Sequence, residues 1–210
     1  MEFRQVLARR RMVRNYLPEA VDSETVDRIV EAGVRSPSAG FTQGQSFVVI
    51  TDETRRAEIA ELAGESSYVA SGFDPWISRA PVHVVICVSE SAYHERYSEP
   101  DKTDPEGNEI EWPVPYWWVD AGASMMAILL AAVDEGLAAG FLGVQSLEGL
   151  STLLGIPDDV APIGVVTLGH PASDRRSSSI DRGRRPGIVH HHGWGGGSRG
   201  QHQPDRPREL

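Results

Sequence analysis

The feature of this sequence that most constrains its fold is a segment over residues 120–135 that is apolar almost all round. It combines small residues with Met, Ile, Leu and Val, and its length is that of a long helix. A surface helix keeps a polar face toward water, so a helix without such a face must be buried on most of its sides. The segment therefore predicts a central helix that packs inside the core or against another subunit.

Two segments read as strands of a buried sheet. Residues 82–88 are apolar on both faces except for His83, as expected of a central strand, and residues 46–51 are rich in β-branched side chains. Further strands are predicted at 140–144 and 163–169, and helices at 2–14, 25–34 (with Asp22 or Ser23 as N-cap), 53–63 and 147–154. Loosely alternating helices and strands indicate an α+β or α/β fold. The glycine motifs of a Rossmann site and of a P-loop are both missing from the sequence.

Charge and cysteine content exclude several classes of protein. The 210 residues carry a net formal charge of −10, which argues against general nucleic-acid binding. Cys87 is the only cysteine, so an internal disulfide and a cysteine zinc cage are excluded. The first residues lack the apolar core of a signal peptide, and the sequence predicts no membrane span of about 18 apolar residues. We expect one main domain in a cytoplasmic protein.

Two clusters of arginine stand out in this acidic chain, at residues 9–14 and 182–185. Like charges this close repel each other, so a fold tolerates them best around an anion. The planar guanidinium fork pairs two oxygen atoms at once, which suits a phosphate. The clusters predict one phosphate held from both ends of the chain. The alternative is a solvated helix face near the N-terminus and a basic tail near the C-terminus.

Residues 89–118 are polar, rich in proline and rich in aromatic side chains. A long loop inside a compact domain is usually functional, so this segment is predicted to be a substrate lid. We expect at least one of Trp112, Tyr116 and Trp117 to stack on a planar substrate, although hydrophobic packing alone is the alternative.

Other candidate sites have weaker support in the sequence. The His190–His192 tract lies in a glycine-rich tail, residues 187–210, which is predicted to be flexible and to lack the rigid surroundings of a metal site. We therefore expect no metal. Cys87 is expected to be a buried strand residue rather than a nucleophile, and Ser38 lacks the partners of a hydrolase triad.

Four motifs occur in order along the chain: Arg10–Tyr16 with its Arg-Arg-x-Val-Arg-x-Tyr pattern, Ser36–Gly40 with Gln43, the end of the apolar helix running into Gly140–Gly143, and Val166–Pro171 followed by the basic segment 182–186. Singly each motif is weak, but together in this order they are specific. The sequence resembles the nitroreductase family of flavin enzymes over about residues 3–186. Residues 1–186 are accordingly predicted to form one FMN-binding domain.

The resemblance implies an α+β fold with a mixed, mostly antiparallel sheet flanked by helices, in an interlocked homodimer with FMN at the subunit interface. It assigns cofactor-binding roles to Arg10, Arg11, Met12 and Arg14, to Arg182 or Arg184 at the phosphate, to the backbone of Leu142 and Gly143 near the ring, to Pro37, Ser38 and Ala39 from the partner subunit, and to Gln43. Phe41 is a further candidate substrate-binding residue, in addition to the aromatic residues of the lid.

The sequence departs from the family pattern at a few positions. Met12 stands where a serine is usual, Phe41 replaces an asparagine, and Gly44-Gln45 replaces a Pro-Trp pair. These changes affect the flavin edge and the wall expected from the partner subunit. They leave the subfamily open.

The implied activity is an FMN-dependent oxidoreductase that takes electrons from NADH or NADPH. It would pass them by a ping-pong route to a small planar acceptor such as a nitroaromatic or a quinone. The flavin carries the chemistry, so no catalytic side chain is named. One alternative is a specialised flavin enzyme of the reductive dehalogenase or flavin-fragmenting type, and another is a non-catalytic flavin-storage protein. The natural acceptor, the choice of nicotinamide and a deazaflavin in place of FMN stay open.

Overall fold

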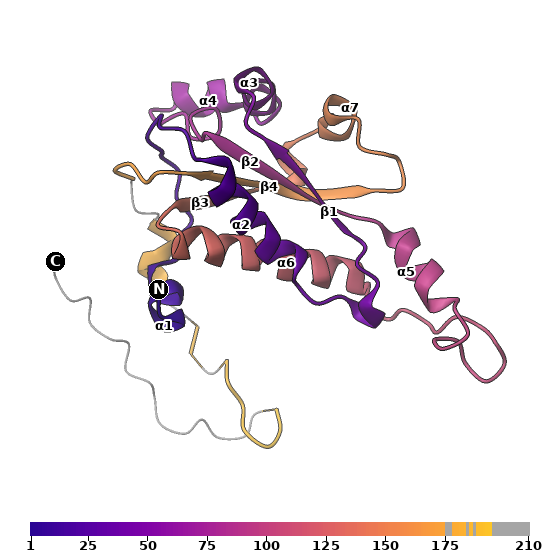
Figure 1. Ribbon diagram of the computed structural model, residues 1–210. Helices are drawn as coiled ribbons and strands as arrows, with labels where there is room; N and C mark the ends of the chain where they lie inside the picture. The colour runs from indigo at the N-terminus through magenta and orange to yellow at the C-terminus, as the bar shows by residue number, and fades with distance from the viewer. Residues whose placement is uncertain (175–177, 184, 187, 195–210) are drawn as a thin grey trace. The chain divides into compact units, whose positions relative to one another are not determined.

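The computed structural model describes residues 1–174, 178–183, 185–186 and 188–194. The chain divides into two units, Met1–Asp174 and Arg175–Leu210. The larger unit contains the sheet and its helices (Figure 1). The described part of the smaller unit contains a 3₁₀ helix, η3 (Ser178–Arg182).

A four-stranded sheet forms the centre of the larger unit. Its strands are β1 (Gln45–Ile50), β2 (Val82–Val88), β3 (Ala138–Gly143) and β4 (Ala161–Gly169), in the order β1-β2-β4-β3. Every neighbouring pair is antiparallel. The predicted α+β class is therefore confirmed, and all predicted strands are present within a few residues of their expected bounds.

Strand β2 is buried on both faces because each face of the sheet supports its own core. Val82, Val84, Ile86 and Val88 join one cluster with α2 (Ser23–Val34) and α6 (Tyr116–Asp134). Val85 and Cys87 point to the other cluster, which includes residues of α3 (Glu53–Leu62) and α7 (Leu150–Leu154). Figure 1 shows α2 and α6 on one side of the sheet and α3, α4 (Glu65–Ala70) and α7 on the other.

Helix α6 is the predicted central helix, but it begins at Tyr116 rather than Asp120. Pro115 stands at its N-cap, where its missing N–H costs no helix hydrogen bond. Ile128 and Leu129 are completely buried against α2 and the sheet. By length and composition alone α6 could also cross a membrane, and 44% of its apolar window is buried inside the fold.

Two segments differ from the sequence-based expectation. The first helix, α1 (Phe3–Arg9), was expected to run to residue 14 but ends at Arg9, and the arginines that follow do not lie on a helix face. The predicted lid 89–118 contains a helix, α5 (Glu90–Tyr97), whose first turn is capped by the Ser89 hydroxyl. Short 3₁₀ helices, η1 (Ala39–Phe41) and η2 (Val144–Ser146), flank β1 and β3.

Candidate functional site

The N-terminal arginine segment leaves α1 and lies along the outer edge of β3. The Val13 N–H donates a hydrogen bond of 2.9 Å to the carbonyl oxygen of Ala139. Tyr16 forms an antiparallel bridge with Pro171, and its hydroxyl lies 2.7 Å from the Thr167 hydroxyl. Burial raises the pKa of the Tyr16 phenol, so this group stays neutral. The segment is thereby fixed beside the sheet.

Gly140 permits this close approach. A Cβ at this position would lie 2.5 Å from the carbonyl oxygen of Val13 and 2.9 Å from the Thr167 hydroxyl oxygen. A side chain of any size would therefore push the N-terminal segment away from β3.

The docked segment places Arg14 at the wall of a cavity of about 280 Å³, here named the Arg14 cavity, which Leu142 and Gly143 also line. The Arg14 guanidinium carbon lies 5.9 Å from the centre of the Trp76 ring, a cation–π distance. The Arg14 backbone N–H donates to the Asp174 carboxylate at 2.9 Å. Three residues predicted to bind the cofactor, Arg14, Leu142 and Gly143, therefore meet at one cavity although they come from distant parts of the sequence.

Other walls of the Arg14 cavity were missed by sequence reasoning. Glu65 is buried and accepts hydrogen bonds from the backbone of Ile77 at 2.6 Å and of Ser78 at 3.2 Å, so its carboxylate anchors the loop before β2. Tyr68 and Gln145 complete the wall, and the Gln145 amide lies directly against Gly143. These residues follow no sequence pattern, and only the folded chain gathers them.

The Arg14 cavity combines one guanidinium with aromatic and apolar groups, the Gln145 amide and the Glu65 carboxylate, whose oxygens accept from the backbone of Ile77 and Ser78. The described residues contain no group of three His, Cys, Asp or Glu side chains that could hold a metal. Cys87 lies in β2, where burial raises the pKa of its thiol to about 11. The cavity therefore suits a flat ligand with an anionic edge better than catalysis by a side-chain nucleophile.

Arg10, Arg11 and Met12, which are also predicted to bind the cofactor, do not line the Arg14 cavity. Arg10 is half-buried at the end of α1, and Arg11 and Met12 are exposed beside it. Arg182 belongs to the smaller unit, and Arg184 lies outside the described residues. The arginine clamp from both chain ends stays a prediction.

The loop that contains Pro37, Ser38 and Ala39 meets a different part of the larger unit. The Ala39 N–H donates to the buried Asp120 carboxylate at 2.8 Å, and the Ser38 hydroxyl accepts from the Gln43 N–H at 2.8 Å. None of these residues lines the Arg14 cavity.

Phe41 and Gln43 in this loop have unusual backbone geometry. Phe41 is 76% exposed. Both residues adopt positive φ angles, 57° and 56°, which are costly for side chains other than glycine and concentrate at functional sites.

The aromatic residues of the predicted lid form a packed cluster. The rings of Trp112 and Trp117 are 5.8 Å apart, and the Tyr93 ring lies 6.2 Å and 6.1 Å from them. Trp117 is only 6% exposed, whereas Tyr116 is 45% exposed. Packing thus accounts for much of this cluster, and none of these rings lines the Arg14 cavity of the same chain.

Comparison with known proteins identifies the family. A sequence model described as the nitroreductase family matches residues 7–170. A Bacillus subtilis protein named FMN reductase [NAD(P)H] is 29% identical over 184 residues, which are 86% of this chain and 69% of that protein. An Archaeoglobus fulgidus protein is 27% identical over 189 residues, 88% of this chain and 94% of its own length. It carries the provisional name NADH dehydrogenase/NAD(P)H nitroreductase.

Solved structures agree with these relatives. A hypothetical oxidoreductase of Bacillus subtilis superposes with a TM-score of 0.70 and 26% identity, covering 92% of this chain and 75% of that one.

Proposed function

Because the chain belongs to the nitroreductase family, we propose that it is an FMN-dependent NAD(P)H oxidoreductase, working as a soluble, cytoplasmic homodimer. The observation that carries the proposal is the meeting of Arg14, Leu142 and Gly143 at one cavity. Relatives named for FMN and for NAD(P)H support the cofactor and the electron donor.

The residues of the Arg14 cavity fit a flavin. The Arg14 guanidinium offers charge-assisted donors to an anionic edge or a phosphate, and Phe141, Leu142 and Gly143 offer a wall for a flat ring. A cation near the ring also favours its reduced, anionic form. Arg10, Arg11, Arg182 and Arg184 are the further arginines proposed to reach the phosphate. When bound, FMN supplies hydride transfer between a nicotinamide and an acceptor.

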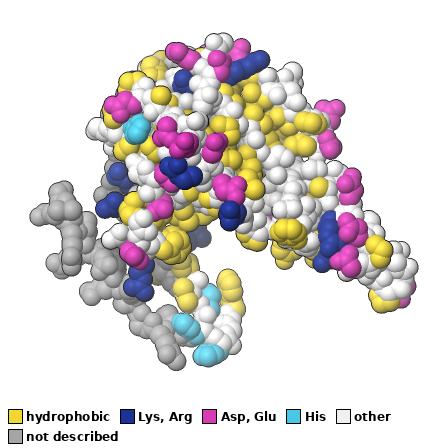
Figure 2. Space-filling view, in the orientation of Figure 1, with side chains coloured by type: hydrophobic (Ala, Val, Ile, Leu, Met, Phe, Trp, Pro, Cys, Tyr) yellow, Lys and Arg dark blue, Asp and Glu magenta, His cyan; other side chains and the backbone are white. Residues whose placement is uncertain are grey.

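A second copy of the chain would complete the site. At about 280 Å³ the Arg14 cavity is at the small end for a cofactor site. Phe3 and Leu7 of α1 and Val119 and Met126 of α6 are exposed apolar side chains. Figure 2 shows hydrophobic side chains reaching the surface of the larger unit in patches between charged groups. We propose that such surfaces pair two subunits and that Pro37, Ser38 and Ala39 of each subunit line the flavin site of the other.

The proposed acceptors are small planar molecules, such as nitroaromatics or quinones, reduced by a ping-pong route. Phe41, Trp112, Tyr116 and Trp117 are proposed to select them at the completed site. The polypeptide would bind and orient both substrates and exclude water, without a side chain acting as acid or base.

Purified protein tests this proposal directly. We expect it to retain a yellow cofactor that is released by denaturation and identified as FMN by mass spectrometry. NADH or NADPH should bleach the flavin band in the absence of oxygen, and a quinone or nitroaromatic should restore it. A flavin that no nicotinamide reduces would indicate storage, and a chain that ignores added FMN would refute the proposal.

A further inference from the structure

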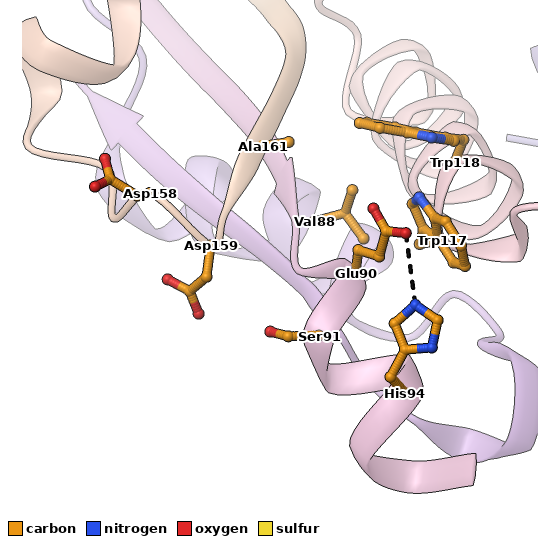
Figure 3. A pocket seen from close by; sticks show the side chains of 9 residues that line it. All are labelled: Val88, Glu90, Ser91, His94, Trp117, Trp118, Asp158, Asp159 and Ala161. Carbon is orange, nitrogen blue, oxygen red and sulfur yellow. Dashed lines mark ion pairs between the residues drawn. The ribbon is translucent and has the colours of Figure 1, made fainter. Parts of the chain in front are cut away.

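A second cavity, of about 350 Å³, lies between the first turns of α5 and α6 and the start of β4. It shares no lining residue with the Arg14 cavity. Figure 3 shows the Trp117 and Trp118 side chains on one side of it, Glu90 between them and His94, and Asp158 and Asp159 across from them. We name it the Trp118 cavity.

Two indole rings give this cavity an aromatic wall. Trp118 is 44% exposed although it is a large apolar side chain. An indole face attracts a cation through its quadrupole more strongly than the other aromatic rings do, and ammonium ligands are recognised in this way. The wall therefore favours a ligand that is both apolar and positively charged.

The charged groups of the Trp118 cavity point to the same ligand. Its lining includes three carboxylates, Glu90, Asp158 and Asp159, and no lysine or arginine. The side chains of Asp158 and Asp159 are exposed, and the cavity wall offers them no lysine or arginine as a partner. The one basic lining residue, His94, is already engaged by Glu109 at 2.7 Å and Glu90 at 3.5 Å. The cavity thus has an uncompensated negative charge.

A buried donor without a partner supplies an independent indication of a ligand. Trp117 is 6% exposed, and its indole N–H has no hydrogen-bond partner among the described residues. Figure 3 shows the indole nitrogen on the side of the ring that faces Glu90 and Trp118. An unpaired buried donor is costly, so such a group calls for an acceptor.

We propose that the Trp118 cavity binds a small organic cation, an alkylammonium that carries a hydroxyl or carbonyl oxygen. The cationic head would lie against the Trp118 ring, near Asp158 and Asp159, and the oxygen would accept from the Trp117 indole N–H. The inference goes beyond the flavin chemistry proposed above and does not depend on it.

Calorimetric titration of the full-length protein with choline tests the inference. We expect saturable binding of choline and none of 3,3-dimethylbutan-1-ol, which has the same shape without the charge. Equal binding of the two, or no binding of choline, would overturn the proposal. The flavin content of each sample is recorded, so a failure here is distinct from a failure of the flavin proposal.

Variants locate the ligand. Trp118→Ala and the double variant Asp158→Asn/Asp159→Asn should each weaken choline binding by about tenfold or more. The control Glu58→Gln/Glu61→Gln removes two carboxylates from α3 and should change nothing. Trp117→Phe should weaken binding of choline but not of tetramethylammonium, which has no oxygen. Near-ultraviolet circular dichroism checks that each variant is folded. Choline affinity that is unchanged in the Trp118 and Asp158/Asp159 variants would contradict the assignment of this cavity.

Discussion

The backbone N–H of Val13 donates a hydrogen bond of 2.9 Å to the carbonyl oxygen of Ala139. Val13 follows α1, and Ala139 lies in the edge strand β3. Their contact places the next residue, Arg14, at the cavity that Leu142 and Gly143 of β3 also line. One backbone contact between distant segments thus determines the candidate flavin site.

Gly140→Ala should break this arrangement. The new methyl group would lie 2.5 Å from the Val13 carbonyl oxygen, so the N-terminal segment must shift. We expect a loss of about 1–3 kcal/mol in the free energy of unfolding, typical of overpacking, together with weaker flavin retention. Denaturant titration measures the first effect and flavin absorbance the second. Ser46→Ala, at an exposed position of β1, is the control and should change stability by less than about 0.5 kcal/mol. Wild-type stability of Gly140→Ala would mean that the contact is not needed.

Arg14→Ala should weaken FMN binding by about 1.5–3 kcal/mol, the usual contribution of a hydrogen bond to a charged group. Arg14→Lys should recover only part of this because lysine keeps the charge and loses the planar fork. Fluorescence titration of the protein stripped of its cofactor provides the measurement. Arg35→Ala, which removes an exposed arginine paired with Glu31 on α2, is the matched control. If Arg14→Ala and Arg35→Ala retain FMN equally well, the role of Arg14 is wrong.

The elements that could be predicted from the sequence are those that carry a clear apolar pattern within their own segment. Strand β2 and helix α6 are apolar on nearly all sides, so no alternative fold could expose them. Helix α5 was missed because Glu90–Tyr97 is mostly polar and its helix is specified by the Ser89 cap and by packing of Tyr93. Helix α1 was predicted too long because a tertiary contact of Val13 with β3 replaces the helix after Arg9.

The same distinction holds for the candidate site. Arg14, Leu142 and Gly143 belong to motifs that match the family pattern, so the sequence alone was enough to predict them. Trp76 and Gln145 reach the Arg14 cavity only because α4, β3 and the loop before β2 come together in the fold. No spacing in the sequence links them. Pro37, Ser38 and Ala39, which are expected to come from a second subunit, do not line the Arg14 cavity of their own chain.

His83 makes the stability of the fold depend on pH. It is the second residue of β2, where burial lowers the pKa of its imidazole from 6.5 to about 4. The hydrogen bond with the Ile77 carbonyl opposes this shift, and the charge of Arg56 adds to it. Between these pKa values the unfolded chain binds a proton and the folded chain does not, so stability falls as pH decreases from about 6.5 to about 4. The loss should approach about 3 kcal/mol.

His83→Leu tests this contribution because it removes the titrating group and stays apolar. Its free energy of unfolding should change less between pH 6.5 and pH 4 than that of the parent protein. His170→Gln removes a histidine outside the core and should keep the parent dependence. An identical pH profile for the parent and His83→Leu would contradict the prediction.

Asp120 should control the order of the loop that carries Ser38 and Phe41. Its buried carboxylate accepts from the Ala39 N–H and from the Tyr93 hydroxyl, both at 2.8 Å through the same oxygen. Burial and the hydrogen bond to Asp120 raise the pKa of Tyr93, so this phenol remains a donor at any physiological pH. Asp120→Ala would leave the buried Tyr93 hydroxyl and the half-buried Ala39 N–H unpaired. It should cost about 2–6 kcal/mol, since each unpaired group costs roughly 1–3 kcal/mol.

The conservative variant separates the hydrogen bonds from the charge. Asp120→Asn keeps an acceptor oxygen at the same place, so it should retain most of the stability and protect the Ala39 amide from hydrogen exchange. In Asp120→Ala the Ala39 amide should exchange much faster. The amides of β2 should keep their slow exchange, which would show that the sheet is intact. Because the loop is proposed to line the partner's flavin site, Asp120→Ala should also raise the KM for the acceptor more than it lowers kcat. Slow exchange of the Ala39 amide in Asp120→Ala would show that other contacts hold the loop.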